Sequence, residues 1–146
     1  YVKSGQHLLR STSTTQAVHA LSSGEAEFAA IVKATSIGLG AVNMLADFGL
    51  AAKLTVHTDS TAARAIATRR GVGKVRHLHT PLLWVQAQSK NGKVYYEKVD
   101  GKDNIADMGT KDLPGPRIAE LLDDCGYMFE AGRHSHALQA QISRTA

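Results

Sequence analysis

Three acidic residues stand where an acid can take part in catalysis. Glu27 falls in the first turn of a predicted long helix, Asp59 ends a predicted strand, and Asp107 lies early in a later predicted helix. Because each begins or ends an element, all three can point into one cleft at a sheet edge. Grouped carboxylates repel one another unless cations bind between them, and such hard oxygen ligands favour Mg²⁺ or Mn²⁺. Two ions roughly 3.5–4 Å apart would activate water for attack on a phosphodiester.

Each acid also has a purely structural interpretation. Glu27 could complement a helix dipole, Asp59 could cap the helix that follows it, and Asp107 could be a solvated helix acid. Spacing and composition alone do not establish that the three side chains meet.

A cationic stretch lies between the second and third of these acids. It contains Arg64, Arg69, Arg70, Lys74, Arg76, His77 and His79, with no acid among them. The whole chain carries a net charge of +4, which is compatible with a nucleic-acid partner. A basic segment beside grouped carboxylates is what a metal-dependent enzyme acting on phosphodiesters needs. The alternative is a solvated basic loop.

The elements that must position these residues alternate between strands and helices. Strand-forming residues over 7–22 predict a pair of strands, or one long bent strand, with a turn near 13–16. Apolar residues at three- and four-residue steps predict a helix over 25–48. Ser22, Ser23 and Gly24 are candidates to cap this helix, and Gly49 is expected to end it. The later predictions are strands over 53–58 and 94–99 and helices over 61–68, 76–90, 103–110 and 118–122.

This order of elements predicts an α/β fold, a mixed sheet with helices on its faces. The 146 residues, 43% of them hydrophobic, suit one domain, which we place over residues 1–129 with a loosely ordered tail over 130–146. No run of 18 apolar residues and no signal peptide is visible, so we expect a soluble intracellular protein without a membrane segment. Cys125 is the single cysteine, which excludes an internal disulfide.

Four segments, in order, resemble the ribonuclease H domain of copia-type retrotransposon polyproteins. They are ALSSGEAEFAA (residues 20–30), Thr58-Asp59-Ser60 with Ala62 and Ala63, GKVRHL (73–78), and VDGKDNIADMGTK (99–111) followed by Leu113 and Pro114. The resemblance covers about 70% of the chain, from about Ser11 to Pro114. Four ordered matches are far more specific than any one of them. The resemblance implies a ribonuclease H-like mixed sheet with flanking helices.

The resemblance also implies roles for individual residues. Glu27, Asp59 and Asp107 match the family's catalytic metal ligands, which in an intact site hold two Mg²⁺ or Mn²⁺ ions. Glu25 is about 200° around the helix from Glu27, so the two do not easily serve one site. The nucleic-acid-binding residues would be Arg69, Arg70, Lys74, Arg76 and His77. Asn104 would be auxiliary, orienting Asp107 or the substrate, or else a plain helix-start residue.

One expected acid does not match any residue of this chain. The family's first catalytic Asp lies on an opening strand, and residues 1–24 contain neither Asp nor Glu. We therefore expect an N-terminally truncated domain whose first strand is missing. Low activity would follow for this chain alone, even where the parent polyprotein is active.

Two functions follow from the resemblance. The first is metal-dependent endonucleolytic cleavage of the RNA strand of an RNA/DNA hybrid during reverse transcription. Its partners would be the hybrid and the reverse transcriptase domain of the same polyprotein, in a cytoplasmic virus-like particle or in the nucleus. The second is a non-catalytic or decayed remnant that binds nucleic acid or supports a neighbouring polymerase domain. An unrelated flavodoxin-like ligand binder ranks third, because no Gly-rich phosphate loop follows a strand.

Overall fold

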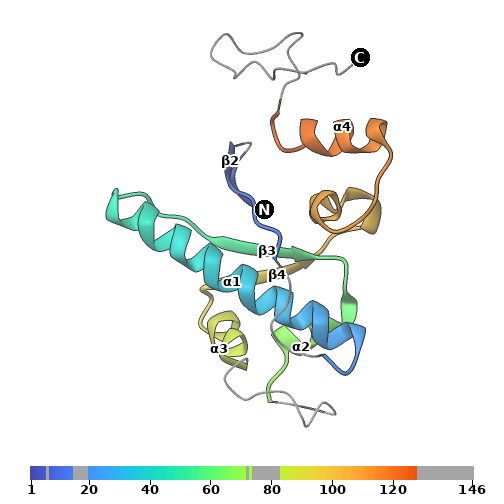
Figure 1. The fold of residues 1–146 in the computed structure, drawn as a ribbon. Coiled ribbons are helices and arrows are strands. Elements are labelled where there is room, and N and C mark those ends of the chain that lie inside the picture. The colour runs from blue at the N-terminus through green and yellow to red at the C-terminus, as the bar shows by residue number, and fades with distance from the viewer. Residues whose placement is uncertain (6, 15–19, 72, 74–82, 128–146) are drawn as a thin grey trace, which may run out of the picture.

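A long helix crosses a parallel pair of strands in the computed structural model of the chain (Figure 1). The helix is α1 (Ser23–Asp47), and the strands are β3 (Leu54–Thr58) and β4 (Val94–Lys98). The structure describes residues 1–5, 7–14, 20–71, 73 and 83–127. The predicted tail over 130–146 lies outside these residues, as does most of the cationic stretch.

The remaining elements in chain order begin with two short strands. They are β1 (Val2–Ser4), β2 (His7–Arg10), α2 (Thr61–Thr68), α3 (Trp84–Lys90), the 3-10 helices η2 (Gly101–Asp103) and η3 (Ile105–Gly109), and α4 (Gly115–Asp123). The described chain is therefore a mixed α/β structure, as predicted at that level. The helix over 61–68 is confirmed residue for residue, and the strands over 53–58 and 94–99 are confirmed to within one residue at one end each.

Helix α1 begins and ends at the residues that its local signals predict. The Ser22 side chain caps its start by accepting a hydrogen bond from the Glu25 N–H at 3.3 Å. Gly49 follows its end with φ +76°, a conformation that glycine adopts at little cost. There the Gly49 N–H donates to the carbonyl of Ala46 and the Leu50 N–H to that of Leu45, both at 2.9 Å, which is a Schellman motif.

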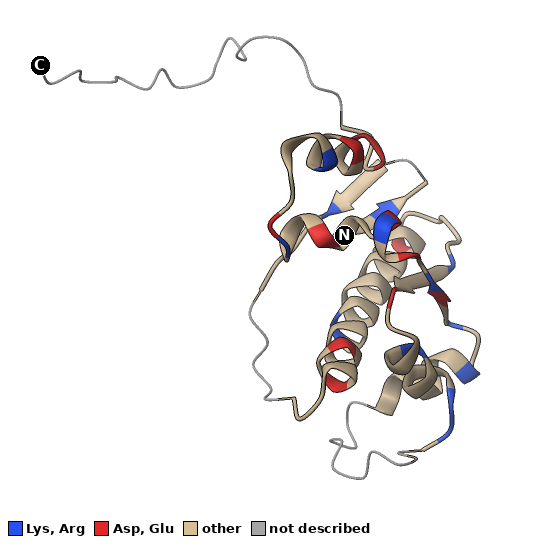
Figure 2. Ribbon diagram, turned by 90° about the vertical axis from the view of Figure 1, so that its right-hand side faces the viewer, with Lys and Arg blue, Asp and Glu red and all other residues tan. Residues whose placement is uncertain are grey.

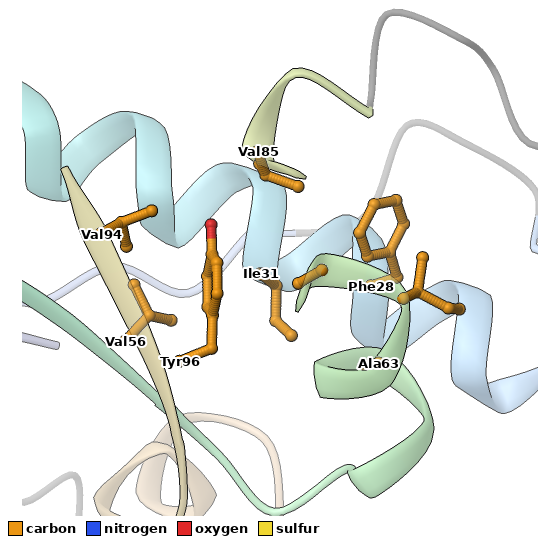
Figure 3. Packing of buried hydrophobic residues seen from close by; sticks show 9 residues of the cluster. Phe28, Ile31, Val56, Ala63, Val85, Val94 and Tyr96 are labelled. Carbon is orange, nitrogen blue, oxygen red and sulfur yellow. The ribbon is translucent and has the colours of Figure 1, made fainter. Parts of the chain in front are cut away.

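Three helices pack against one face of the β3–β4 sheet (Figure 3). The core consists of Phe28 and Ile31 of α1, Val56 of β3, Ala63, Ile66 and Ala67 of α2, Val85 of α3, and Val94 and Tyr96 of β4. Side chains alternate along a strand, so Val56 and Tyr96 are buried while His57 and Tyr95 face away and are exposed. Leu83 and Trp84 are partly buried and pack against this core.

Close contact between α1 and β3 depends on a glycine. A Cβ atom at Gly38 would lie 2.5 Å from Cδ1 of Leu54, whereas one at Gly40 would meet nothing within 4 Å. The absence of a side chain at Gly38 therefore makes room for Leu54 at the start of β3.

The strands form two sheets of two, and this departs from the single sheet that we predicted. β1 pairs with β2 in an antiparallel hairpin, while β3 pairs with β4 in parallel. Of the strands predicted over 7–22, only β2 is found among the described residues: it ends at Arg10, its partner β1 precedes it, residues 11–14 and 20–22 are not strand, and residues 15–19 lie outside the described ranges. Gly5, with φ +58°, lies in the connection between the two strands. Among the described helices, α1, α2 and α3 cover one face of the parallel sheet, and its opposite face is exposed around His57 and Tyr95.

Two helix predictions also need correction. The helix expected over 103–110 is instead the pair of 3-10 helices η2 and η3. Of the helix expected over 76–90, the described part begins at Trp84, and residues 74–82 are outside the described ranges. α4 begins at Gly115, earlier than expected, because Pro116 is tolerated in the first turn of a helix.

Helix α1 is also long and apolar enough to cross a membrane, by length and composition alone. Its 18-residue window has a mean hydropathy of 1.5, and 22% of that window is buried within the protein. We predicted no such segment from uninterrupted apolar runs. This one helix is weak evidence for a membrane segment, because core helices of soluble proteins and signal sequences have the same properties. Phe28, Ile31 and Thr35 of α1 are buried against the rest of the fold.

Candidate active site

Asp59 lies at the carboxyl end of β3, where the chain turns into α2. The Thr58 side chain accepts a hydrogen bond from the Ser60 N–H at 3.1 Å, and the Thr58 carbonyl accepts one from the Val99 N–H at 3.0 Å. Ser60, not Asp59, caps α2, because its Oγ accepts from the Ala63 N–H at 3.2 Å. The capping interpretation of Asp59 is therefore wrong. The half-buried carboxylate of Asp59 lies at the end of β3 and does not cap α2.

Glu25 and Glu27 have separate roles at the start of α1. Glu25 is 9% exposed, and its Oε2 accepts a hydrogen bond from the Leu21 N–H at 3.0 Å. Together with the Ser22 cap, this is close to a capping box, so Glu25 secures the helix end. Glu27 is exposed on another side of the helix. A Cβ at Gly24 would lie 3.4 Å from Cβ of Ala62, so the starts of α1 and α2 are adjacent.

Asp107 is the most buried of the three candidate acids, at 9% exposed. It lies in η3, which Asn104 caps by accepting a hydrogen bond from the Ala106 N–H at 3.2 Å. The backbone carbonyl of Asp107 accepts from the N–H groups of Thr110 and Lys111 at 3.1 and 2.9 Å. Asn104 is thus the residue that starts the turn carrying Asp107, which is the plainer of the two roles considered for it.

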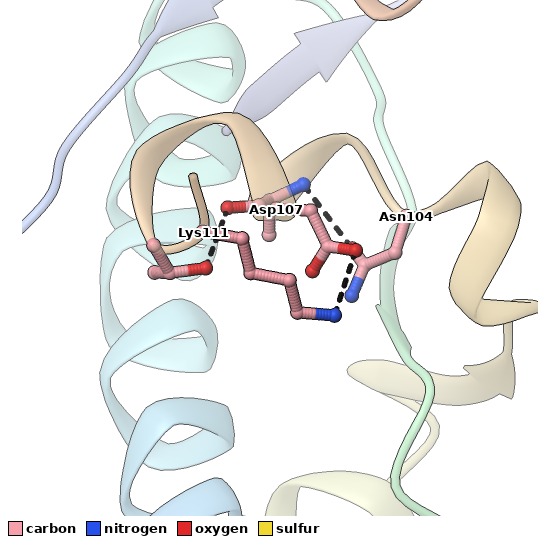
Figure 4. A network of polar contacts seen from close by, with 5 residues as sticks. Asn104, Asp107 and Lys111 are labelled. Carbon is pink, nitrogen blue, oxygen red and sulfur yellow. Dashed lines mark hydrogen bonds and ion pairs between the residues drawn. The ribbon is translucent and has the colours of Figure 1, made fainter. Parts of the chain in front are cut away.

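A lysine contacts the Asp107 carboxylate. Lys111 Nζ donates to Asp107 Oδ2 at 2.9 Å (Figure 4). We did not single out Lys111 from the sequence. The available signal was its position four residues after Asp107, a spacing at which opposite charges on one face of a helical turn meet.

The N-terminal segment is tied to this turn and to α1. The Ser13 hydroxyl donates to the carbonyl of Gly109 at 2.9 Å, and Lys33 of α1 donates to the Thr14 hydroxyl. Residues 11–14 therefore connect the turn that holds Asp107 with the helix that holds Glu27.

The electrostatics place the three acids and the lysine in one neighbourhood. Partial burial raises the pKa of Glu27 above its usual 4.5, the charges of Asp59 and Asp107 raise it further, and Lys111 opposes them. The hydrogen bond to Asp107 raises the pKa of Lys111, and the negative charges of Asp107, Asp59 and Glu27 act in the same direction. The charges of Asp59 and Asp107 thus act on Glu27 and Lys111, which links the start of α1, the end of β3 and η3 electrostatically. Figure 2 shows the acidic bands at the N-terminal end of α1.

The donor set suits a divalent cation in chemistry and charge. Three carboxylates supply hard oxygen ligands, and the pKa of Glu27 is raised first by partial burial and then by the charge of Asp59. Among the described residues, however, no three His, Cys, Asp or Glu side chains are close enough together to hold one ion in this arrangement. A three-ligand site therefore requires movement of at least one carboxylate.

The basic candidates are only partly within the described ranges. Arg69 is half-buried after α2, and a Cβ at Gly73 would lie 2.6 Å from its guanidinium carbon, so that guanidinium packs against the backbone at Gly73. Arg70 is exposed. Lys74, Arg76 and His77 lie outside the described residues. The eight residues of α2 span about 12 Å, which separates Arg69 and Arg70 from Asp59.

Gln86 of α3 has a structural role that we did not predict. Its side-chain amide donates to the carbonyls of Ile66 and Gly71 at 2.8 and 3.1 Å, and its oxygen accepts from the Gly71 N–H at 2.8 Å. These bonds hold the start of the basic segment against α3. Cys125, just after α4, is 2% exposed and is therefore a core residue.

Comparison with known proteins does not assign the chain to a family. No family model matches the chain, and no curated protein or solved structure is similar enough to count as a match.

Proposed function

We propose that the chain is a ribonuclease H-type domain of a copia-type retrotransposon polyprotein, which cleaves the RNA strand of RNA/DNA hybrids. The observation that carries the proposal is that the charges of Asp59 and Asp107 raise the pKa of Glu27, although the three acids come from elements far apart in the sequence. Two of the three, Asp59 and Asp107, follow the carboxyl ends of adjacent parallel strands, the sheet edge at which ligands of α/β proteins bind. The ordered motif resemblance supplies the family and the substrate.

In this proposal the three carboxylates would hold Mg²⁺ or Mn²⁺. The bound ions would activate water for attack at phosphorus and stabilise the departing oxygen, leaving a 3′-hydroxyl and a 5′-phosphate. Asp107 would be the fixed ligand, because η3 and its Asn104 cap set its backbone. Glu27, on the exposed side of α1, would be free to adjust its side chain toward the other two. A fourth acid on a preceding strand, as the family resemblance implies, would complete the set.

The basic residues after α2 would bind the phosphate backbone of the hybrid. Arg70, exposed just beyond the C-terminal end of α2, would contact a phosphate at some distance from the cut. Such contacts carry no base sequence, so choice of the hybrid would rest on its shape and its 2′-hydroxyl groups. Binding should weaken as salt concentration rises.

A hybrid-cleavage assay with Mg²⁺ tests the proposal, using this chain and a longer one that restores the preceding segment. Asp59→Asn and Asp107→Asn should each reduce the cleavage rate about 10²-fold or more, because each removes charge that the reaction needs. Asp123→Asn, in exposed α4, is the matched control and should cleave at the wild-type rate. Cleavage by Asp59→Asn at the wild-type rate would exclude Asp59 as a ligand.

A non-catalytic nucleic-acid-binding domain is the second candidate. The observation that favours it is that no three-ligand group exists among the described residues, while Lys111 is paired with Asp107. Hybrid binding without Mg²⁺-dependent cleavage, in the longer chain as well, would select this function. In either case the proposed partner is the reverse transcriptase domain of the same polyprotein, inside the cell.

A further inference from the structure

The side chain of Gln86 in α3 bonds the backbone just after α2 on both sides of one residue. Its Oε1 accepts from the Gly71 N–H at 2.8 Å, and its Nε2 donates to the Gly71 carbonyl at 3.1 Å. An antiparallel strand makes the same pair of bonds to its neighbour. The Nε2 group also donates at 2.8 Å to the carbonyl of Ile66, one of the last four carbonyls of α2, which lack partners within the helix. One side chain thus fixes the end of α2 and the segment after it.

These bonds determine where the backbone of Arg70 lies. The Gly71 N–H belongs to the planar peptide unit that also contains the Cα and carbonyl of Arg70. On the other side, the Arg69 N–H donates to the Ala65 carbonyl at 3.2 Å, which closes α2. The backbone of Arg70 is therefore held through both of its neighbours, while its side chain is exposed. A cation on a fixed backbone loses less freedom when it binds an anion.

The preceding arginine has a different environment. Arg69 is half-buried, and a Cβ at Gly73 would lie 2.6 Å from its guanidinium carbon and 2.6 Å from its Nη1. A guanidinium packed against the chain can reach a ligand only by leaving these contacts. Arg69 therefore shapes this segment, whereas Arg70 is presented to solvent.

The part of the chain around Arg70 carries positive charge without acids. From Ser60 to Tyr96 the sequence contains no Asp or Glu, and this range includes both α2 and α3. The two helices pack against each other, and Arg64 of α2 and Lys90 of α3 add to the positive charge. A surface with charge of one sign attracts polyanions such as the phosphate backbone of a nucleic acid.

We propose that Gln86 is a positioning residue for phosphate binding, which holds Arg70 outward for the backbone of a nucleic acid. Of the two arginines after α2, Arg70 makes the phosphate contact, and Arg69 has a structural role. The inference rests on the nucleic-acid partner in the proposed function and not on a metal site. It therefore applies equally to the nuclease and to the non-catalytic binding domain.

Binding of a labelled RNA/DNA hybrid in EDTA, followed by fluorescence anisotropy at several salt concentrations, tests the two arginines without cleavage. Arg70→Gln should weaken binding roughly tenfold at low salt. It should also reduce the slope of log affinity against log salt by about one, the value for one phosphate contact. Arg69→Gln should lower the thermal midpoint and leave this slope unchanged. All titrations are made well below the thermal midpoint of each variant.

A double-mutant cycle tests Gln86. Gln86→Met has a side chain of similar length that cannot bond Gly71, and it should weaken hybrid binding about threefold. The same substitution should have no effect on affinity when Arg70→Gln is already present, because no phosphate contact is left to position. A purely structural role would give the same loss in both backgrounds. Gln88→Met, about 200° further around α3, is the matched control and should bind like wild type.

The outcomes separate this inference from the proposed function. No salt-dependent hybrid binding by wild type overturns both. Wild-type affinity and slope in Arg70→Gln, or an equal reduction of the slope in Arg69→Gln, overturn the assignment of the phosphate contact and leave nucleic-acid binding standing. An unchanged affinity in Gln86→Met, or an equal loss in both backgrounds, overturns the positioning role. Should Gln86→Met fail to fold, Gln86→Asn, which is one methylene shorter, takes its place in the cycle with the same expectations.

Discussion

The helical side of the β3–β4 sheet and the end of the molecule formed by β1, β2 and α4 are held together by different means. The first has a continuous core in which Phe28 and Val85 are fully buried. The second consists of strands of three and four residues and a nine-residue helix, with Leu121 and Cys125 as its buried residues among those described. There Lys3 of β1 donates a hydrogen bond to the Asp124 carbonyl at the end of α4.

This difference bears directly on the carboxylates. Glu27 and Asp59 are attached to elements of the continuous core, whereas Asp107 lies in η3, which contacts α4. The candidate site therefore joins a firmly packed part of the molecule to a lightly packed one. The geometry of the candidate site should therefore respond to substitutions in the firmly packed part and to substitutions in the lightly packed part.

Truncating one fully buried side chain on each side should have the largest effect. Phe28→Ala should lower the free energy of unfolding by about 3–5 kcal/mol, and Leu121→Ala by about 2 kcal/mol, since the lightly packed end can collapse around the smaller side chain. Urea denaturation measures both. Amide exchange in Leu121→Ala should accelerate in β1, β2 and α4 while β3 and β4 stay protected. Equal acceleration in β3 and β4 would show that the two parts unfold as one unit.

A glycine pair tests how tightly the core side is packed. Gly38→Ala should destabilise the protein by about 1–2 kcal/mol, because its Cβ would meet Leu54 at 2.5 Å. Gly40→Ala, with no neighbour within 4 Å, should stabilise it by about 0.5–1 kcal/mol through better helix propensity. Thermal unfolding of the two variants gives the comparison. Stabilisation by Gly38→Ala would mean that Leu54 moves aside freely.

Removal of the Glu27 charge should have the smallest effect. Because the folded protein raises the pKa of Glu27 above 4.5, it binds this proton more tightly than the unfolded chain does. Ionised Glu27 therefore costs stability above its folded pKa, and the cost disappears as the pH falls below 4.5. Glu27→Gln should stabilise the metal-free protein by a few tenths of a kcal/mol at pH 7 and not at pH 4, given its exposure.

Glu120→Gln is the control for this pH dependence. It removes an acid that is paired with Arg117 on the surface, so it should be neutral or slightly destabilising at pH 7. Unfolding midpoints of both variants and wild type across pH 4–8 provide the measurement. A destabilising effect of Glu27→Gln at pH 7 would contradict the electrostatic strain that we assign to this acid.

Local signals explain which features could be predicted. The limits of α1 depend on Ser22 and Gly49, which act on neighbouring residues, and both were predicted from the sequence. The pairing of β3 with β4 joins residues far apart in the chain, so the division into two sheets was not predicted. The β1–β2 hairpin is local, but it was missed because the strand prediction began only at His7. Asp107 was expected in an α-helix, but it lies in the second of two consecutive 3-10 helices. The neighbouring residue types do not distinguish an α-helix from 3-10 helices. The choice of Glu27 over Glu25 came from the motif resemblance, and the angle around a helix indicated only that the two acids do not easily serve one site.

A buried pair of hydroxyl groups determines how β4 is aligned in the fold. Thr35 of α1 and Tyr96 of β4 lie with their oxygen atoms 3.0 Å apart, and the Thr35 hydroxyl also contacts the Ile31 carbonyl at 2.8 Å. If β4 slipped by one residue, Glu97 or the outward-facing Tyr95 would take the place of Tyr96. A slip toward Glu97 would bury a charge and remove the hydroxyl partner of Thr35. A slip toward Tyr95 would keep a phenol there, so the hydroxyl pair excludes the first slip, and the alternation of buried and exposed side chains along β4 excludes both.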